Sequence, residues 1–332
     1  MTTRQNTAAD KRRLTPIFWF FICVYLRSSA ALFAAPAPQI YSLAWRPDGR
    51  AIALGGYKEV RIVDAATRQP IATLGGEIEA VRAVAFSRDG KLLAAAGGLP
   101  ARKGEVKIWN LSSPAASVTI AGHSDCIYAA AFSPDGAMLA TASYDKLIKL
   151  WDVASGKELR TLRDHIDAVY ALAFTPDGQR LISGAADRSV KVWDVGTGKR
   201  LYTLSDPTDG INSVALSPDG TRVAAGGLDK TIRIWKLGPE GGTLENSLIA
   251  HEDAILKLAW SPDGKYLASA SADRTIRLFR AADLSEIRTI VKLPDWAFGL
   301  EFAPDGKSLA AGFFNGVLQI YGVDHDQMLA AK

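Results

Sequence analysis

The sequence predicts an all-β protein built from seven similar units, and three observations support this prediction. Short apolar runs, typical of buried strands, follow one another along most of the chain. No long segment carries apolar residues at the helical spacing of three and four positions. A turn that ends in Asp-Gly recurs at intervals of 41 to 46 residues, with its Asp at positions 48, 89, 135, 177, 219, 263 and 305.

The recurring turn is expected to join two strands. Its second residue is Pro in six copies and Arg in the other. Pro fixes φ at about −65°, the Asp side chain can accept a local backbone hydrogen bond, and Gly follows without steric restriction. This combination is typical of a type I turn, so the seven copies indicate seven β-hairpins.

The third unit shows the order of strands most clearly. Apolar runs at 127–132, 137–143 and 147–151 predict three strands, and 158–162 predicts a fourth. Runs of this kind at this spacing are typical of strands buried on both faces between stacked sheets. Such a four-stranded sheet cannot cover both of its faces alone, and a closed ring gives every sheet two neighbours. We therefore expect a seven-bladed β-propeller with four antiparallel strands per blade.

The N-terminus has the pattern of a secretory signal peptide. Three basic residues at 11–13 precede a ten-residue apolar run at 17–26, and residues 29–31 are small, as signal peptidase requires. The run is shorter than the roughly 20 apolar residues that cross a bilayer, so no integral membrane span is expected. We expect cleavage near Ala31; a retained anchor and a disordered tail are the alternatives.

The charge distribution argues against a nucleic-acid partner. Residues 1–31 carry five basic side chains against Asp10 and account for the whole formal net charge of +4. The rest of the chain is formally neutral, and its basic residues alternate with acidic ones. A surface that binds nucleic acid needs clustered Lys and Arg.

The two cysteines predict no internal disulfide in the mature chain. Cys23 lies in the expected leader, and Cys126 then stands alone. Export remains compatible with this, because disulfides are common but not required outside the cytosol. We expect Cys126 to be a buried thiol.

Several motifs resemble those of the WD-repeat family. Gly122-His123, Trp151-Asp152 and Trp193-Asp194 recur in register with the period of the turns, and the resemblance covers roughly 40–332. It further resembles bacterial WD-repeat domains of exported proteins, some of which lie beside cytochrome c modules. The haem-attachment motif Cys-x-x-Cys-His is absent from this chain, so no haem is expected.

The resemblance implies a structural hydrogen-bond network inside the blades. Its expected members are His123, Ser143, Asp145 and Trp151 in the third unit, His165, Asp187 and Trp193 in the fourth, and His251, Ser271 and Asp273 in the sixth. Ala185 and Phe279 interrupt the set in the fourth and sixth units, so only the third is expected to be complete. Buried polar groups need partners of this kind.

No pattern of catalytic or metal-binding residues is evident in the sequence. The His, Asp and Ser residues of the network occur once per blade, too far apart around a ring to act on one atom. We find no nucleophile elbow, no phosphate-binding loop and no Cys or His cluster with metal-ligand spacing. The sequence therefore predicts a protein that is not an enzyme and holds no metal or cofactor.

Departures from the repeat indicate where a partner could bind. One position near the start of each innermost strand holds Tyr41, Arg82, Tyr128, Tyr170, Asn212, Leu256 and Phe298. In the family this position lines the narrower face around the central channel. Aromatic side chains are favoured at protein interfaces, and packing between blades is the equally weighted alternative. The hypothetical partner-binding set is Tyr41, Tyr57, Arg82, Tyr128, Tyr144, Tyr170, Trp296, Phe298 and Phe314.

Two further departures concern a loop and the seam of the ring. A four-residue insertion within 98–104 gives the second unit a longer loop with a basic tip, more simply explained as tolerated variation than as a binding loop. At the seam, 29–33 and 328–332 align with the same outermost strand of the last blade. If the leader is cleaved, we expect the C-terminal segment to occupy that place.

These inferences give a signal peptide at 1–31, a linker at 32–39 and a propeller at 40–332. The favoured function is a non-catalytic protein-interaction scaffold, exported to the periplasm or cell envelope, that binds a partner on its narrow face. The alternatives are a propeller enzyme acting on a small substrate at the channel mouth, and a cytoplasmic location.

Overall fold

The computed structural model describes residues 38–113 and 117–323, and every regular element in these ranges is a β-strand. The expected signal peptide and most of the linker lie outside the described residues. Where the chain is described, no helix has the length and apolar character needed to cross a membrane.

Hydrogen bonding groups the strands into six sheets. The first contains β1 (Ser42–Trp45), β2 (Ala51–Gly55), β3 (Tyr57–Asp64), β4 (Pro70–Phe86), β5 (Leu92–Leu99), β6 (Lys103–Asn110) and β7 (Ser117–His123). The second contains β8 (Ile127–Phe132), β9 (Met138–Ser143), β10 (Ile148–Asp152) and β11 (Glu158–Leu162). The third contains β12 (Val169–Phe174), β13 (Arg180–Ala185), β14 (Val190–Asp194) and β15 (Arg200–Leu204).

The remaining three sheets follow the same order. The fourth contains β16 (Ile211–Leu216), β17 (Arg222–Gly227), β18 (Thr231–Leu237) and β19 (Gly242–Ile249). The fifth contains β20 (Ile255–Trp260), β21 (Tyr266–Ser271), β22 (Ile276–Arg280) and β23 (Glu286–Ile290). The last contains β24 (Ala297–Phe302), β25 (Ser308–Phe313) and β26 (Leu318–Gly322).

The seven-stranded first sheet consists of two blades that share one long strand. The first part of β4 pairs with β3 as the outermost strand of blade 1, and its last part pairs with β5 as the innermost strand of blade 2. The chain passes between these blades without the loop that separates the others. This continuity was not expected from the sequence, which suggested separate four-stranded units throughout.

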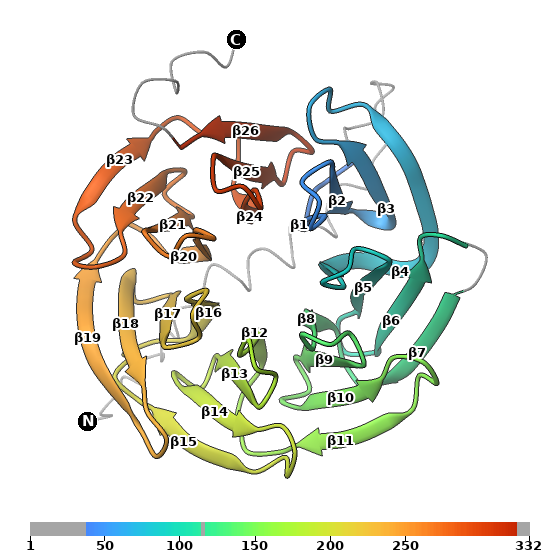
Figure 1. Ribbon diagram of the computed structural model, residues 1–332, viewed down its shortest axis with the longest axis horizontal. Helices are drawn as coiled ribbons and strands as arrows, with labels where there is room; N and C mark the ends of the chain where they lie inside the picture. The colour runs from blue at the N-terminus through green and yellow to red at the C-terminus, as the bar shows by residue number, and fades with distance from the viewer. Residues whose placement is uncertain (1–37, 114–116, 324–332) are drawn as a thin grey trace, which may run out of the picture. The chain divides into compact units, whose positions relative to one another are not determined.

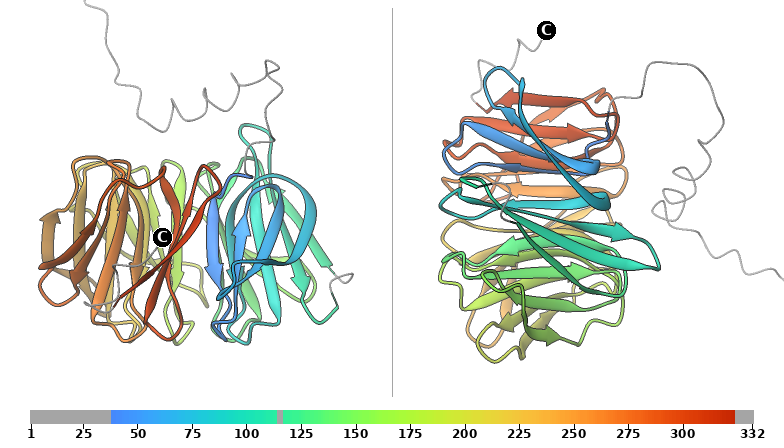
Figure 2. Two further views of the ribbon diagram at one scale, coloured as in Figure 1. Left: turned by 90° about the horizontal axis from the view of Figure 1, so that it is seen from above. Right: turned by 90° about the vertical axis from the view of Figure 1, so that its right-hand side faces the viewer.

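The innermost strands close a ring, as Figure 1 shows. In sequence order β1, β4, β8, β12, β16, β20 and β24 each pack against the next, and β24 packs against β1. Two hydrogen bonds reinforce this last contact, because the backbone N–H and indole N–H of Trp45 both donate to Glu301. This ring of innermost strands agrees with the predicted seven-bladed propeller. In the side views of Figure 2 the strands run across the thickness of the ring, so the loops gather on two opposite faces.

The Asp-Gly turns take the predicted form and end every innermost strand. In the turn after β8, the N–H of Gly136 donates to the carbonyl of Ser133, and Oδ1 of Asp135 accepts the N–H of Ala137. Gly136 has φ of 73°, in the left-handed region that suits Gly. We call the side of the ring that carries these seven turns the turn face, and the opposite side, where the innermost strands begin, the aromatic face.

The core lies between neighbouring blades. Each large cluster of buried apolar side chains combines residues from two blades, and Trp193 of blade 4, for example, packs with Leu150 and Leu162 of blade 3. Trp193 and the corresponding Trp235 of blade 5 are almost fully buried. Because each blade is covered only by its neighbours, loss of order in one blade exposes the core of the next.

The seventh blade has three described strands, and the outer edge of β26 is unpaired within the described residues. The two segments expected to compete for this edge, 29–33 and 328–332, lie outside the described residues. The closing role of the C-terminal segment therefore remains a prediction.

Truncation after Asp326 is expected to lower the melting temperature by a few degrees, because β26 would lose its outer neighbour along a half-buried edge. Thermal unfolding of the mature chain followed by circular dichroism measures this shift. An unchanged melting temperature would show that the C-terminal segment does not complete the blade.

Candidate functional site

A chain of buried hydrogen bonds joins four side chains in blade 3. Nδ1 of His123 lies 2.8 Å from Oδ2 of Asp145, and Nε2 lies 2.8 Å from the hydroxyl of Thr141. The indole N–H of Trp151 donates to the same hydroxyl, also at 2.8 Å. Because the carboxylate can only accept, Nδ1 carries the proton, and Nε2 accepts from Thr141 in the neutral imidazole. This network fixes the loop before β8 to the body of the blade.

The expected hydroxyl of this network is corrected by the structure. Ser143, two residues after Thr141, donates instead to the backbone carbonyl of Asp125 and accepts the N–H of Asp145. Both side chains lie on the same face of β9, but Ser143 is next to the turn and stabilises the turn. The two hydroxyl residues share one face of β9, and their positions along the strand decide that Thr141 contacts His123. The expectation of Ser143, which is nearer Asp145 in the sequence, was wrong.

The same correction applies in blades 4 and 6. In blade 4, Ser183 bridges Nε2 of His165 (2.7 Å) and the indole of Trp193 (2.8 Å), so this network is complete although position 185 is Ala. In blade 6, Ser269 contacts Nε2 of His251 at 2.6 Å, whereas Ser271 binds the carbonyl of Asp253.

Hydrogen bonding controls the ionisation of the buried acids. Burial alone would raise the pKa of Asp187, but hydrogen bonds from His165, Ser189 and the Ile166 N–H outweigh it and lower the pKa to about 2. Burial also lowers the pKa of His251, against the attraction of Asp273. The ionised Asp187 and His165 therefore form a structural pair within the blade.

Blade 5 contains a variant network that the sequence analysis missed. The indole N–H of Trp235 donates to Asp206 at 2.8 Å, and the guanidinium of Arg233 binds Asp229 at 2.6 Å. No His takes part in either contact. A search for Asp in the loop before β16 could have found it, since a buried indole N–H needs an acceptor.

The aromatic face brings together eight of the nine residues of the hypothetical partner-binding set. The guanidinium of Arg82 lies 5.7 Å from the ring centre of Tyr41 and 4.9 Å from that of Tyr128. Tyr128 contacts Tyr170 edge to face at 4.9 Å and Tyr144 at 6.3 Å. Four consecutive blades thus contribute to one cluster around a cation.

The cluster continues across the seam of the ring. Phe314 contacts Tyr41 at 5.9 Å on one side and Phe298 at 6.0 Å on the other, and Trp296 lies 6.5 Å from Phe298. We call the continuous set the aromatic chain; its members are Trp296, Phe298, Phe314, Tyr41, Arg82, Tyr128, Tyr144 and Tyr170. The ninth expected residue, Tyr57, instead donates a hydrogen bond to Glu79.

The exposure of these side chains is graded. Tyr57 and Tyr144 are 51% and 39% exposed, whereas Tyr41 is 8% exposed and acts mainly as packing. Tyr128 is half-buried, and its hydroxyl has no hydrogen-bond partner in the structure. Burial raises the pKa of Tyr128 and of Tyr170, so both keep their phenolic protons.

The aromatic chain does not continue through blades 5 and 6. At the corresponding positions, Asn212 donates to the backbone carbonyl of Ile255, and Leu256 supplies no polar group. The face is therefore asymmetric, with aromatic side chains from blade 7 through blade 1 to blade 4.

The insertion in the second unit is a hairpin extension rather than an irregular loop. Gly98 pairs with Gly104 and Leu99 with Lys103, which lengthens β5 and β6 beyond the corresponding strands of the next blades. The N–H of Ala101 donates to Asp125 at 2.8 Å, so the tip is attached to the loop that leads into β8. It therefore stands beside the blade that supplies Tyr128.

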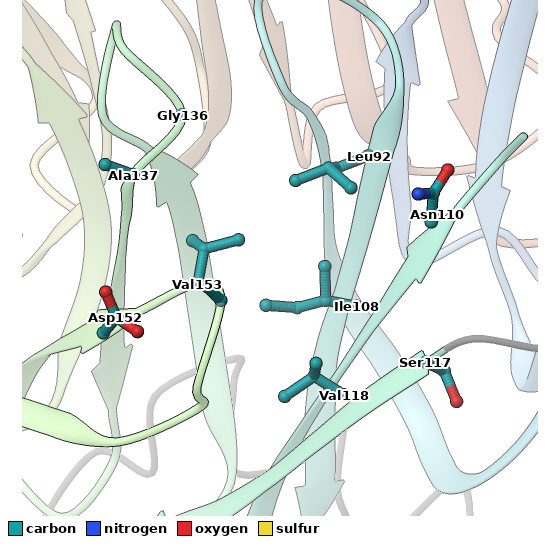
Figure 3. A pocket seen from close by; sticks show the side chains of 10 residues that line it. Leu92, Ile108, Asn110, Ser117, Val118, Gly136, Ala137, Asp152 and Val153 are labelled. Atoms are coloured by element: carbon teal, nitrogen blue, oxygen red, sulfur yellow. The ribbon is translucent and has the colours of Figure 1, made fainter.

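A surface pocket of about 530 Å³ lies between blades 2 and 3 near the turn face. Figure 3 shows Leu92, Ile108 and Val118 on one side and Val153 on the other. At the positions that correspond to Leu92 and Val118, blade 4 has Arg180 and Tyr202, which both bind the carbonyl of Gly238 in the next blade. Short apolar side chains leave the same space open between blades 2 and 3.

A second cavity, of about 570 Å³, occupies the end of the central channel at the turn face and holds two charged side chains, Lys257 and Glu301. They lie on neighbouring strands, β20 and β24. The sequence analysis missed this pair. Alignment of the innermost strands could have found it, since both residues stand where the other blades have Ala, Ser or Gly.

Comparisons with known families agree with this architecture. Residues 168–331 match the family model described as the IFT122 first beta-propeller, and residues 68–110 and 116–152 match that of the WD domain, G-beta repeat. The chain belongs to the WD-repeat β-propeller family. A search of curated proteins found no match.

WD-repeat propellers generally bind protein partners and are typically non-catalytic. Within the described part of this WD-repeat propeller, no three His, Cys, Asp or Glu side chains form a group that could hold a metal ion. Cys126, the cysteine that lies within the described residues, is a buried free thiol. Burial raises the pKa of this thiol.

Proposed function

We propose that this WD-repeat protein is a non-catalytic scaffold that is exported to the cell envelope and binds a protein partner through the aromatic chain. The observation that carries the proposal is the continuity of that chain, which joins blades 7, 1, 2, 3 and 4 around Arg82. Large rigid aromatic side chains and Arg dominate the energetics of protein interfaces.

The buried hydroxyl of Tyr128 supports a partner with hydrogen-bonding groups. It has no acceptor in the structure, and a buried polar group without a partner costs free energy. A carbonyl or carboxylate of the partner that reaches this hydroxyl would also lie near the guanidinium of Arg82, whose centre is 4.9 Å from the Tyr128 ring. We therefore expect an acidic or carbonyl-rich segment of the partner at this point.

Export is supported by the signal-peptide pattern at 1–31 alone. The aromatic chain functions in the same way in either compartment, so export and partner binding need separate measurements. Mass spectrometry of the N-terminus of the protein purified from its native host tests export. A chain that begins near Ala31 is expected, and an intact N-terminus would contradict export.

Partner binding is tested by affinity purification of the tagged protein from its native host. Replacing both Tyr128 and Tyr170 by Ala is expected to reduce recovery of the partner at least tenfold, because two contact side chains are removed from one cluster. The matched control is Leu159→Ala with Leu201→Ala, which removes exposed apolar side chains from the outermost strands of the same two blades.

The control should recover the partner as the unaltered protein does. Melting temperatures of both double variants show whether any loss comes from unfolding. Retention of the partner by the folded Tyr128 and Tyr170 variant would overturn the assignment of this surface. Deleting residues 99–102 in a separate variant decides whether the neighbouring hairpin tip also takes part.

A further inference from the structure

Two charged side chains interrupt an otherwise regular pattern on the innermost strands. At the position of Lys257 the other blades carry Ser42, Ala83, Ala129, Ala171, Ser213 and Gly299. At the position of Glu301 they all carry Ala: Ala44, Ala85, Ala131, Ala173, Ala215 and Ala259. Glu301 accepts the N–H of Trp45 where blades 7 and 1 meet, whereas Lys257 has no such structural partner among the described residues.

Both side chains line the cavity of about 570 Å³ at the turn-face end of the channel. They are the only charged residues among those that line it. The other lining residues are of apolar types, and five strands each contribute one aromatic residue: Trp45, Phe86, Phe132, Trp260 and Phe302. Polar atoms form about half of the cavity surface, so the space combines apolar side chains with convergent polar groups, as small-molecule sites do.

The two charges do not satisfy each other fully. One carboxylate oxygen of Glu301 accepts the backbone N–H of Trp45 at 2.8 Å. The ammonium of Lys257 makes no hydrogen bond or ion pair with the described residues, although its side chain is surrounded by the innermost strands and exposed to the channel. A cation whose one charged neighbour in the cavity wall is Glu301 can pair with an anion that enters the channel.

The ionisation of Glu301 favours the same conclusion. Enclosure raises the pKa of Glu301 to about 7, against the Trp45 N–H and the attraction of Lys257, which lower it. Enclosure also lowers the pKa of Lys257, while Glu301 raises it. Near neutral pH, Glu301 is therefore partly protonated and can donate a hydrogen bond to an anion held by Lys257.

We infer that the turn-face end of the channel binds a small organic monocarboxylate with an apolar body. Its carboxylate would pair with the ammonium of Lys257 and accept a hydrogen bond from protonated Glu301, and its body would lie against the aromatic wall. A monoanion fits better than a phosphate dianion, because one cation beside a carboxyl group does not balance two negative charges. This site is at the opposite end of the channel from the aromatic chain and is independent of the proposed partner.

Calorimetric titration of the purified protein with 3-phenylpropionate at pH 6.0 tests the inference. Saturable one-to-one binding is expected, and the neutral 3-phenylpropionamide should bind at least tenfold more weakly. Lys257→Ala installs a residue type that other blades carry and should weaken 3-phenylpropionate binding at least tenfold. The control Lys265→Ala removes an exposed Lys from the turn of the same blade and should have no effect.

The pH dependence separates this site from nonspecific attraction. Binding should weaken about tenfold between pH 6.0 and 8.5, as Glu301 loses its proton and repels the ligand. In Glu301→Gln this part of the pH dependence should disappear, because Gln remains neutral. The Tyr128 and Tyr170 double variant should bind 3-phenylpropionate normally, which distinguishes this site from the partner surface. Absence of saturable binding, or equal binding by Lys257→Ala, would overturn the inference.

Discussion

Replacing Asp187 by Ala is expected to lower the free energy of unfolding by about 3–5 kcal/mol. Oδ2 of Asp187 accepts from Nδ1 of His165 at 2.7 Å and from the N–H of Ile166 at 3.1 Å, and Oδ1 accepts from the N–H and hydroxyl of Ser189. The side chains of Asp187 and His165 are 3% and 1% exposed. Alanine would leave the His165 and Ser189 donors buried without this acceptor.

The control for this variant is Asp177→Ala in the Asp-Gly turn of the same blade. Asp177 is exposed and accepts from Gln179 and Thr175, so its removal should cost about 1 kcal/mol. Chemical denaturation at pH 7 measures both values. Equal effects of the two substitutions would contradict a special structural role for the buried network.

Acidification provides a second test of the Asp187 network. The pKa of Asp187 is about 2 in the folded protein and has its ordinary value of 3.8 when no partner is present. The folded-state pKa is depressed, so its contribution is complete above about pH 4 and is lost as the pH falls toward 2. The stability difference between the unaltered protein and Asp187→Ala should therefore shrink over this interval.

Replacing Glu301 by Gln is expected to stabilise the protein by about 2 kcal/mol at pH 8 and to have little effect at pH 4.5. The pKa of Glu301 is raised from 4.5 to about 7 on folding, so the folded state favours the protonated form. The unaltered protein therefore loses stability as the pH rises from about 4.5 to 7. A shift of this size corresponds to about 3 kcal/mol, reduced here because the channel admits solvent.

Glutamine preserves the acceptor for the Trp45 N–H while removing the charge. Thermal unfolding across pH 4.5 to 8 measures the difference, with Glu240→Gln on an exposed loop as the control. Lys257 is the other charged side chain of the cavity, so the same comparison in the Lys257→Ala background shows how much of the effect depends on it. Parallel stability curves for Glu301→Gln and the unaltered protein would show that Glu301 is ionised without penalty.

The sequence was sufficient to predict the propeller because its signals are local and repeated. Each Asp-Gly turn needs only its own few residues, and Gly136 and its six counterparts all adopt positive φ values. The apolar runs before and after each turn have the length and the alternation that are typical of short strands. Because the sequence predicted seven similar sheets, a closed ring was the arrangement that gives every blade a neighbour on both faces.

The partners within each blade could not be predicted from spacing alone. Thr141 and Ser143 share one face of β9, and the choice between them depends on how far the loop carrying His123 reaches over the strand. Ser183 was missed for the same reason, although it completes the network of blade 4. The distance from the His ring to each hydroxyl depends on how the loop packs over the strand. The position of a residue in the repeat does not give that distance.

The sequence by itself determined the all-β class, the repeat, the family resemblance and the residues that could form an aromatic surface. Only the tertiary structure decided that Tyr41, Arg82, Tyr128 and Tyr170 form one contact chain, and that Lys257 and Glu301 share a cavity. These residues are separated by about 40 or more positions in the chain. Turn chemistry acts over a few residues, whereas contacts across blades exist only after the ring has closed and the innermost strands lie side by side.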